Sequence, residues 1–391
     1  MPVVRVGFIL GDVGWMGGVN YFRSLLAAIQ TLPNAKIHPV VFVGFKSDAS
    51  HFQGYAEIIR TKALDRYSLP WWIGKFIERT GIGRNYIIYL LLRKNNIHLA
   101  SHYDGLWRGC KIPSLGWIPD FQHIHLRQFF TSKELLRRDF NISRQIKKCS
   151  ALLLSSQDSL KDFRIFCPEK LIQTYVLNFT PNPLLPKELL NYSAVAQQYN
   201  LTKPWLHLPN QFWAHKNHSI VIEALNLLKL KGVDVLVVCT GSTDDYRNPQ
   251  YFQSLMKRVH EYGLEENFIV LGVLPYRDMM SILHHSIATI NPSLFEGWST
   301  TVEESKAMGK KIILSNIAVH REQNPQRGVY FPPDNAEELA ALIFHHNLEY
   351  DATLEEKCFI DAAELTKERF FQFGTLYEDI ALKIVKSHVV Q

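Results

Sequence analysis

Apolar segments that read as buried strands alternate with amphipathic helical segments along most of this chain. Residues 3–10 form a continuous apolar run, and the segment that follows its Gly-rich turn, VNYFRSLLAAIQ, repeats apolar side chains at helical spacing. The same order recurs at the segments ALLLSS and VDVLVVCTG and at the helical segments behind them. Strands that alternate with helices in this way pair in parallel, because each helix returns the chain to the start of the next strand. The sequence therefore predicts an α/β fold of mostly parallel, doubly wound sheets.

The length of the chain predicts two domains. A chain of 391 residues exceeds one ordinary hydrophobic core, and 47% apolar with 20% charged residues is typical of a globular protein. Several prolines and asparagines interrupt the alternation between residues 178 and 204, which is typical of a linker. We predict a first Rossmann-like domain at 1–190, a second at 200–370, and a terminal helix at 371–391 with no strand after it.

The stretch NPSLFEGWSTTVEESKAMG, at 291–309, places two carboxylates around a turn that opens into a helix. An apolar strand precedes it, Ser299 or Thr300 is the expected N-cap, and Gly309 is the expected stop. Free amides at such a helix start bind anions, above all phosphate. Glu296 lies before the helix and Glu304 about one turn inside it, so the two carboxylates address different hydroxyl groups of one ligand. The alternative is that Glu303 and Glu304 are only first-turn acids that favour the helix dipole.

This stretch resembles the nucleotide-sugar site of the retaining glycosyltransferases of family 4. The resemblance rests on the spacing of Glu296 and Glu304, with Pro292, Ser293 and Gly297 around the first and AMGKKIILS after the second. It implies a GT-B fold, in which two Rossmann-like domains face an interdomain cleft, the first binds the acceptor, and the terminal helix crosses back to the first domain. It also implies that Glu296 contacts the donor sugar, that Glu304 holds the ribose, and that the backbone between them contacts sugar hydroxyls and phosphate, at Gly297, Trp298, Ser299, Thr300, Thr301 and Val302.

Two loops in the first domain are candidate walls of that cleft, because ligands of open parallel sheets bind outside the carboxyl ends of strands. The loop GDVGWMGGVN would bring the backbone of Gly17 to an acceptor and that of Gly18 to the donor, unless it is simply a Gly-rich turn. The loop GWIPDFQHIHLRQFF carries Asp120, His123 and His125. The resemblance makes His123 the best match for a catalytic histidine beside the sugar, with Asp120 and His125 on the acceptor side. The histidines can equally be satisfied surface residues.

Two loops in the second domain complete the candidate site. Lys216, in LPNQFWAHKNHSIVIEAL, is placed to reach the phosphates as a compact point charge, although a solvated lysine at a helix start is the alternative. The family usually has an arginine in this loop, whereas this chain has Asn210, Gln211 and Phe212, which removes one cation from the diphosphate. The resemblance still places Asn210 and Gln211 among the residues that contact the donor. The loop LGVLPYRDM resembles the one that holds the nucleotide base through backbone groups near Val273 and Leu274.

No cofactor is predicted. His123 and His125 lack a third ligand at metal-binding spacing, and no Asp-x-Asp motif is present, so we expect no obligatory metal. The cysteines are odd in number and form no C-x-x-C pair, which favours a reducing compartment: Cys110, Cys149, Cys167, Cys239 and Cys358. The first residues read as a buried strand rather than a signal peptide, and no apolar run is long enough to span a bilayer. A cytoplasmic protein is expected, with or without contact with the inner face of the membrane.

The net charge of +6 is mild and suits anionic ligands without indicating nucleic acid. Residues 61–94 mix aromatic with basic side chains, which fits a membrane interface or a lipid-linked glycan, and also fits ordinary packing. The family's commonest role predicts transfer of a hexose-type sugar from a nucleotide-sugar to a glycan or lipid-linked glycan, in bacterial lipopolysaccharide, O-antigen or capsule synthesis. The alternatives are a nucleotide-sugar 2-epimerase of the same architecture and an inactive nucleotide-sugar-binding protein. A NAD-dependent dehydrogenase is disfavoured because no dinucleotide fingerprint follows a leading strand.

Overall fold

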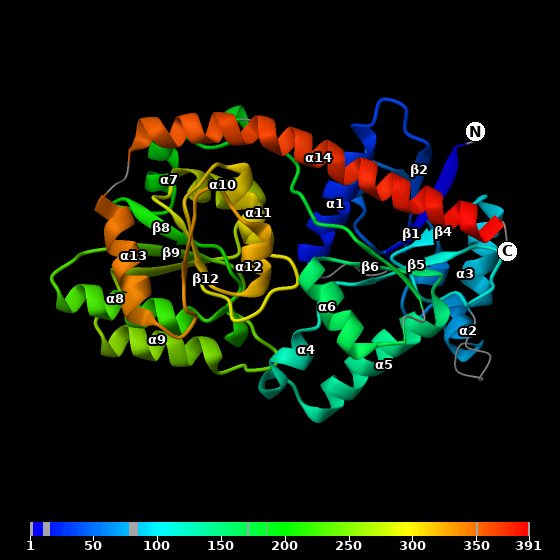
Figure 1. Cartoon of the computed structure of the whole chain (residues 1–391), viewed down its shortest axis with the longest axis horizontal. Coiled ribbons are helices and arrows are strands. Elements are labelled where there is room, and N and C mark those ends of the chain that lie inside the picture. The colour runs from blue at the N-terminus through cyan, green and yellow to red at the C-terminus, as the bar shows by residue number, and fades with distance from the viewer. Residues whose placement is uncertain are drawn as a thin grey trace. The chain divides into compact units, whose positions relative to one another are not determined.

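The computed structural model describes residues 3–10, 16–77, 85–169, 172–184, 186–348 and 351–389. The chain divides into two compact units. The first comprises residues 1–121, 132–182 and 368–391, and the second comprises 122–131 and 183–367. Each unit contains one parallel sheet with helices on its faces (Figure 1).

The first unit is built on a seven-stranded sheet of order β3-β2-β1-β4-β5-β6-β7, and every described strand pair in it is parallel. The predicted alternation of strand and helix is therefore confirmed. The elements of this half of the sequence are β1 (Val4–Ile9), α1 (Met16–Gln30), β2 (Ile37–Val43), β3 (Glu57–Arg60), α2 (Leu69–Ile77), α3 (Tyr86–Lys94), β4 (Leu99–Ser101), β5 (Ser114–Ile118), α4 (Gln122–His125), α5 (Ser132–Lys148), β6 (Ala151–Leu154), α6 (Gln157–Phe166) and β7 (Gln173–Val176).

The second unit is built on a six-stranded parallel sheet of order β10-β9-β8-β11-β12-β13. Its elements are α7 (Tyr192–Gln198), β8 (Trp205–Leu208), the short 3-10 helix η6 (Ala214–Lys216), α8 (His218–Leu230), β9 (Leu236–Thr240), α9 (Tyr251–Glu261), β10 (Phe268–Gly272), α10 (Tyr276–His285), β11 (Thr289–Asn291), α11 (Thr300–Ala307), β12 (Ile312–Ser315), α12 (Ala318–Gln323), β13 (Gly328–Phe331), α13 (Ala336–Leu348) and the first part of α14 (Ala352–Val389).

The core of the second unit lies on both faces of its sheet. Helices α8, α9 and α13 cover one face and α10 and α11 the other (Figure 1). The strands β8, β9 and β12 are buried at every position, which explains why they read as continuous apolar runs in the sequence. One cluster of buried side chains joins α8, α13 and α9 to the sheet, among them Val221, Leu225 and Leu339.

The segment predicted as a linker is partly structured. Residues 192–198 form α7, which packs with α10 in the second unit. Tyr192 stacks on the buried Trp205 at 5.3 Å between ring centroids, and the Leu190 amide donates to Ser281 Oγ at 2.9 Å. No proline lies between residues 187 and 203, so the cluster of prolines marks only the first part of the segment as irregular. The contact units accordingly separate at residues 182 and 183 rather than near 190.

The terminal helix α14 begins at Ala352, well before residue 371, and appears as the long orange to red helix in Figure 1. Strong helix formers without glycine or proline fill residues 352–370, so nothing in the sequence ends the helix there. Its first part belongs to the second unit and its residues from 368 onward to the first. No helix among the described residues combines the length and the apolar character that crossing a membrane requires.

A buried ion-pair group attaches the start of α14 to the second unit. Glu355 accepts a hydrogen bond from Lys310 Nζ at 2.9 Å and is also paired with Arg327. The Lys310 side chain is 1% exposed and that of Glu355 8%. Burial raises the pKa of Glu355, but hydrogen bonds from Arg327 and Lys310 outweigh burial and hold the pKa below its ordinary value.

We predict that Glu355→Ala destabilises the protein by about 3 kcal/mol, because it leaves the buried Lys310 cation unpaired. A carboxylate whose pKa is lowered by folding stabilises the native state at any pH above its pKa in the unfolded chain. The difference in free energy of unfolding between wild type and variant is therefore at its full size at neutral pH. It shrinks as the pH falls below the ordinary value of 4.5 and through the lowered pKa. Urea unfolding at several pH values measures this. Glu364→Ala, in an exposed pair with Lys367 on the same helix, is the control and is expected to change stability little. Equal effects of the two variants would contradict the prediction.

Candidate functional site

The candidate site lies where the strand order of the second sheet reverses. The strands β8 and β11 are neighbours in the sheet, with β9 and β10 on one side of the pair and β12 and β13 on the other. The loops that leave the carboxyl ends of two such strands diverge, and ligands of open parallel sheets bind in the crevice between them. Residues 209–217 leave β8 and residues 292–299 leave β11, so these two loops form the candidate site.

The helix after β11 is capped as the sequence predicts. Ser299 is the N-cap of α11, and its Oγ accepts from the Val302 amide at 3.4 Å. Gly309 follows the helix with φ +61°, a conformation that favours glycine, and a Cβ there would lie 2.2 Å from the Cys358 carbonyl oxygen. Within the described residues, the Thr300 and Thr301 amides make no hydrogen bond. Those two donors are therefore available to an anion.

Lys216 and Glu296 form an ion pair between the two loops. Lys216 Nζ donates to Glu296 Oε1 at 2.6 Å, and the two side chains are 17% and 10% exposed. Ser293 Oγ donates to the same carboxylate oxygen at 2.7 Å. The 3-10 helix η6 places Lys216, and Asn217 then turns the chain into α8 through a left-handed backbone with φ +55°. A cation and a carboxylate, both largely buried, thus meet at the switch point of the sheet.

Amide and hydroxyl side chains fix the geometry of both loops. Asn210 Nδ2 donates to Asn291 Oδ1 at 3.1 Å, and Asn291 Nδ2 donates to Ser299 Oγ at 2.8 Å. Thr301 Oγ1 donates to Asn210 Oδ1 at 3.1 Å. The side chains of Asn210, Ser299 and Thr301, which the resemblance assigns to the donor, therefore hold the loops together.

A glycine lets a third loop approach. A Cβ at Gly241, which has φ +135°, would lie 2.7 Å from the Asn210 carbonyl oxygen and 2.9 Å from the Gln211 amide nitrogen. Gln211 itself is half-buried. Next to it, Phe212 is fully buried and stacks on His218 at 4.2 Å between ring centroids. The position that usually supplies a second cation in the resembled family is thus the half-buried Gln211, between Asn210 and the core residue Phe212.

The adjacent acids of α11 have different environments. Glu303 is fully buried and accepts from Gln323 Nε2 at 3.0 Å and from Lys306 Nζ at 3.2 Å. Glu304 is 7% exposed. Glu303 is an acid in the first turn, as the alternative reading has it, and it is also a structural carboxylate that holds α12 to α11.

The histidine segment from the first half of the sequence packs in the second unit. His125 is exposed, and its ring stacks on Phe295, next to Glu296, at 5.2 Å between centroids. His123, on the same short helix α4, is 1% exposed. Asp120 lies in the first unit and pairs with Arg138 at 2.9 Å. The structure thus places His125 beside the Glu296 loop, while Asp120 has a partner within the first unit.

The remaining predicted residues lie on separate loops or in the first unit. Gly17 and Gly18 lie in the first turn of α1, not in a loop, and the preceding residues 11–15 are outside the described part. Their amides are first-turn donors without partners in their own helix. Val273 is 70% exposed after β10, and Leu274 packs against a core cluster, so backbone contact is what this loop can offer a base.

Two buried residues near the ion pair give no signal in the sequence. His320 is fully buried, and burial lowers its pKa to about 4, so its ring is neutral at pH 7. Nearby Glu296 raises that pKa and Lys216 lowers it, which shows that the ring senses the pair. Arg247, whose side chain is 5% exposed, lies over the ring of Trp213 in the β8 loop. Neither residue stands in a recognisable motif, because only the tertiary structure brings them to the site.

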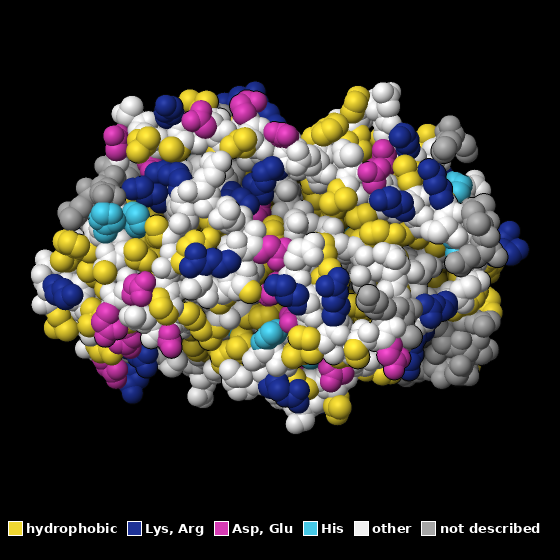
Figure 2. All heavy atoms as spheres, viewed as in Figure 1, with side chains coloured by type: hydrophobic (Ala, Val, Ile, Leu, Met, Phe, Trp, Pro, Cys, Tyr) yellow, Lys and Arg dark blue, Asp and Glu magenta, His cyan; other side chains and the backbone are white. Residues whose placement is uncertain are grey.

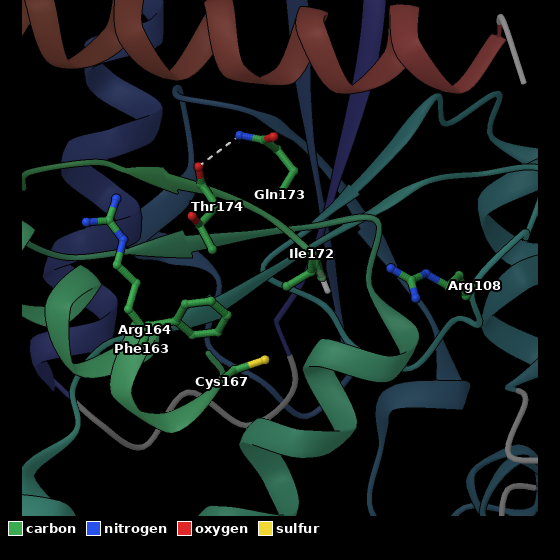
Figure 3. Close-up of a pocket in the computed structure, with 7 residues that line it drawn as sticks. All are labelled: Arg108, Phe163, Arg164, Cys167, Ile172, Gln173 and Thr174. Atoms are coloured by element: carbon green, nitrogen blue, oxygen red, sulfur yellow. Dashed lines mark hydrogen bonds between the residues drawn. The ribbon is translucent and has the colours of Figure 1, made fainter. Parts of the chain in front are cut away.

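The cavity shown in Figure 3 lies elsewhere. It has a volume of about 400 Å³ and is in the first unit, at the amino end of β7 and the carboxyl end of α6. Its lining residues are Arg108, Phe163, Arg164, Cys167, Ile172, Gln173 and Thr174. Because parallel sheets bind ligands at the opposite, carboxyl edge, this cavity is not the candidate site.

On the face shown in Figure 2, basic side chains are scattered among acidic and apolar ones. Among the described residues, no group of three or more His, Cys, Asp or Glu side chains is arranged to hold a metal ion.

Known proteins with this architecture include several glycosyltransferases. The structure of Anabaena Alr3699/HepE in complex with UDP and glucose matches with a TM-score of 0.68 at 15% identity, over 98% of this chain and 100% of that one. A glycosyltransferase from Rickettsia africae ESF-5 matches with a TM-score of 0.67 at 18% identity, over 100% of this chain and 99% of that one. WaaG, a glycosyltransferase involved in lipopolysaccharide biosynthesis, matches with a TM-score of 0.60 at 15% identity, over 97% of this chain and 99% of that one. At these identities the likeness establishes the fold.

No curated protein matches this chain in sequence. The model of the family described as glycosyl transferases group 1 matches residues 196–345, which contain both loops of the candidate site. Residues 196–345 are therefore a glycosyl transferases group 1 domain, and the chain as a whole has the GT-B fold.

Proposed function

We propose that this protein is a glycosyltransferase that moves a hexose-type sugar from a nucleotide-sugar to a glycan or lipid-linked glycan, with retention of configuration at the transferred carbon. The observation that carries the proposal is the Lys216–Glu296 pair, 2.6 Å apart, beside the free first-turn amides of α11. A diphosphate needs cations and amide donors, and a sugar needs hydrogen-bond acceptors for its hydroxyls. The candidate site offers donors for a diphosphate and an acceptor for sugar hydroxyls at the same switch point of the sheet.

The chemistry of each group in the candidate site indicates its role in the proposed reaction. Lys216 and the amides near Thr300 and Thr301 stabilise the negative charge that develops on the leaving diphosphate. Glu296 accepts hydrogen bonds from sugar hydroxyls, and Glu304 accepts them from the ribose. Glu296 is not assigned as a nucleophile, because a double displacement needs a second acid across the reacting carbon and Glu304 serves the ribose. Attack then occurs on the face that the diphosphate leaves, and the leaving oxygen accepts the acceptor proton.

The donor is a nucleoside diphosphate sugar in this proposal. HepE has been crystallised with UDP-glucose, and a trehalose-6-phosphate protein from E. coli, matching with a TM-score of 0.65 at 11% identity over 96% of this chain and 98% of that one, with UDP-2-fluoro glucose. UDP-glucose is therefore the first donor to assay, together with GDP-, ADP- and dTDP-sugars. Assays without acceptor separate transfer from 2-epimerisation, since an epimerase converts donor alone.

For the acceptor we propose a lipid-linked glycan of cell-surface polysaccharide synthesis, met at the inner face of the membrane. The support is an apolar stripe on α2, where Leu69, Trp72, Ile73 and Phe76 follow helical spacing and are 73%, 52%, 44% and 69% exposed. An amphipathic helix normally turns such a stripe to the core. The exposed Lys62 and Arg66 precede the helix, and basic residues beside an apolar stripe suit an anionic lipid surface. Residues 78–84 of the predicted 61–94 region lie outside the described part.

We predict that Lys216→Ala and Glu296→Ala each lower kcat by roughly 100-fold or more, because each removes a group that acts on developing charge or sugar orientation. Steady-state assays with the best donor measure this, and circular dichroism checks folding. Lys203→Ala, which breaks a surface pair with Asp234, is the matched control and should leave kcat unchanged. A folded Lys216→Ala or Glu296→Ala enzyme with near-wild-type kcat would remove that residue from the mechanism.

The exposure of the two histidines predicts opposite phenotypes. His125→Ala, which alters an exposed side chain at the Glu296 loop, should lower kcat about tenfold or more while the thermal midpoint changes little. His123→Ala removes a buried side chain and should lower the thermal midpoint by several degrees. Kinetics and thermal unfolding of both variants test this. Unchanged kcat in His125→Ala, with a loss confined to His123→Ala at equal stability, would return the catalytic assignment to His123.

The membrane proposal is tested on the α2 stripe. The double variant Trp72→Ser and Phe76→Ser should lose at least about tenfold in affinity for vesicles with anionic lipid, since it removes two aromatic anchors. Co-sedimentation with anionic and with neutral vesicles measures binding. Tyr246→Ser, which alters a side chain 72% exposed in the second unit, is the control. Equal sedimentation of both variants, or none of the wild type, would rule out this surface.

A further inference from the structure

Arg247 carries a positive charge into the interior of the second unit. Its side chain is 5% exposed, and its nearest carboxylate is Asp245, with 3.6 Å between Nε and Oδ1. Asp245 is in turn 2% exposed at its side chain and accepts hydrogen bonds from the Ala214 and Arg247 amides. Burying a cation is costly unless other groups compensate it. The groups that compensate Arg247 therefore indicate what it does.

One set of these groups belongs to the histidine segment, residues 122–131. Arg247 Nη1 donates to Gln122 Oε1 at 3.1 Å, and the guanidinium carbon lies 5.0 Å from the centre of the Phe130 ring. Gln122 stands at the start of the segment and Phe130 near its end, with His123 and His125 between them. A single side chain thus holds both ends of the segment that carries the histidines.

The other set belongs to the loop that carries Lys216. The guanidinium carbon lies 4.6 Å from the centre of the Trp213 ring, and Nη2 is 3.4 Å from His215 Nδ1. The His215 carbonyl oxygen accepts from the Leu294 amide at 2.8 Å, which ties this loop to the loop of Glu296. Stacking on aromatic rings and a forked set of donors are properties of arginine that lysine lacks.

We propose that Arg247 is a positioning residue that clamps the histidine segment against the Lys216 loop and so sets His125 beside the Glu296 loop. All of these contacts lie inside the second unit. The guanidinium of Arg247 is engaged by the histidine segment and by the Lys216 loop, so its effect passes through the two segments that it joins. The inference rests on the proposed function only in assigning a catalytic role to those segments, because the clamp itself is a structural statement.

Arg247→Lys is the main test, since it keeps the charge beside Asp245 and removes the fork and the stacking. Phe130→Leu, which weakens the same clamp from the segment side without altering any charge, is the second variant. Arg258→Lys is the control, because Arg258 pairs with Glu223 and is 43% exposed. Amide hydrogen exchange over residues 122–131, kcat, donor KM and the thermal midpoint are measured on the full chain.

The clamp predicts faster exchange over residues 122–131 in both test variants and a kcat lower by about tenfold, with donor KM within about twofold. It also predicts that Arg247→Lys adds little to the loss caused by His125→Ala, because both act on one geometry. The clamp is overturned if residues 122–131 exchange at the wild-type rate in the test variants. It is also overturned if the kcat losses of Arg247→Lys and His125→Ala multiply in the double variant, or if kcat falls only in proportion to the fraction of folded protein. Near-wild-type transfer by Lys216→Ala and Glu296→Ala would instead overturn the proposed function, while the exchange result would still decide the clamp.

Discussion

The reversal of strand order between β8 and β11 is the constraint on which the site depends. Parallel pairing brings the carboxyl ends of these strands together, and the loops that follow them must then find partners for their own polar groups. Asn210 and Asn291 supply those partners through hydrogen bonds that link the two loops and the N-cap of α11. Once these bonds are made, Lys216, Glu296 and the first-turn amides have fixed positions. The hydrogen bonds of Asn210 and Asn291 thus hold the candidate groups in place without using them, which is the condition for a preorganised site.

The sequence predicts the regular elements well where the physical signal is local. The helix α1 follows from helical spacing, and the start of α11 after Ser299 and its end before Gly309 follow from capping chemistry. It predicts less where an element depends on distant partners. The helix α7 is stabilised by packing against α10 and Trp205, and the start of α14 by Lys310 and Arg327, none of which lies nearby in sequence.

The same distinction applies to the site. The sequence singles out Lys216 and Glu296 because their loops have characteristic spacing, and the structure brings these two side chains together. Arg247 is not identified from the sequence, because its contacts join residues 122–131 to residues more than 80 positions away. The resemblance favours His123 over His125, but it carries no information on burial, which separates the buried His123 from the exposed His125. Side chains such as Asn210 and Thr301 read equally well as ligand contacts and as supports, and only their hydrogen bonds to each other decide between the two.

The absence of the family's usual arginine from the β8 loop can be read physically. The arginine would stand at Gln211, which is half-buried between Asn210, hydrogen-bonded to Asn291, and Phe212, packed in the core, so an uncharged amide replaces the guanidinium there. In this chain Lys216 is already neutralised by Glu296 at 2.6 Å. A donor diphosphate therefore meets a paired cation, and its own charge must compete with the Glu296 carboxylate for Lys216. Glu296 released in this way would be free to accept from sugar hydroxyls, which couples recognition of the sugar to recognition of the diphosphate.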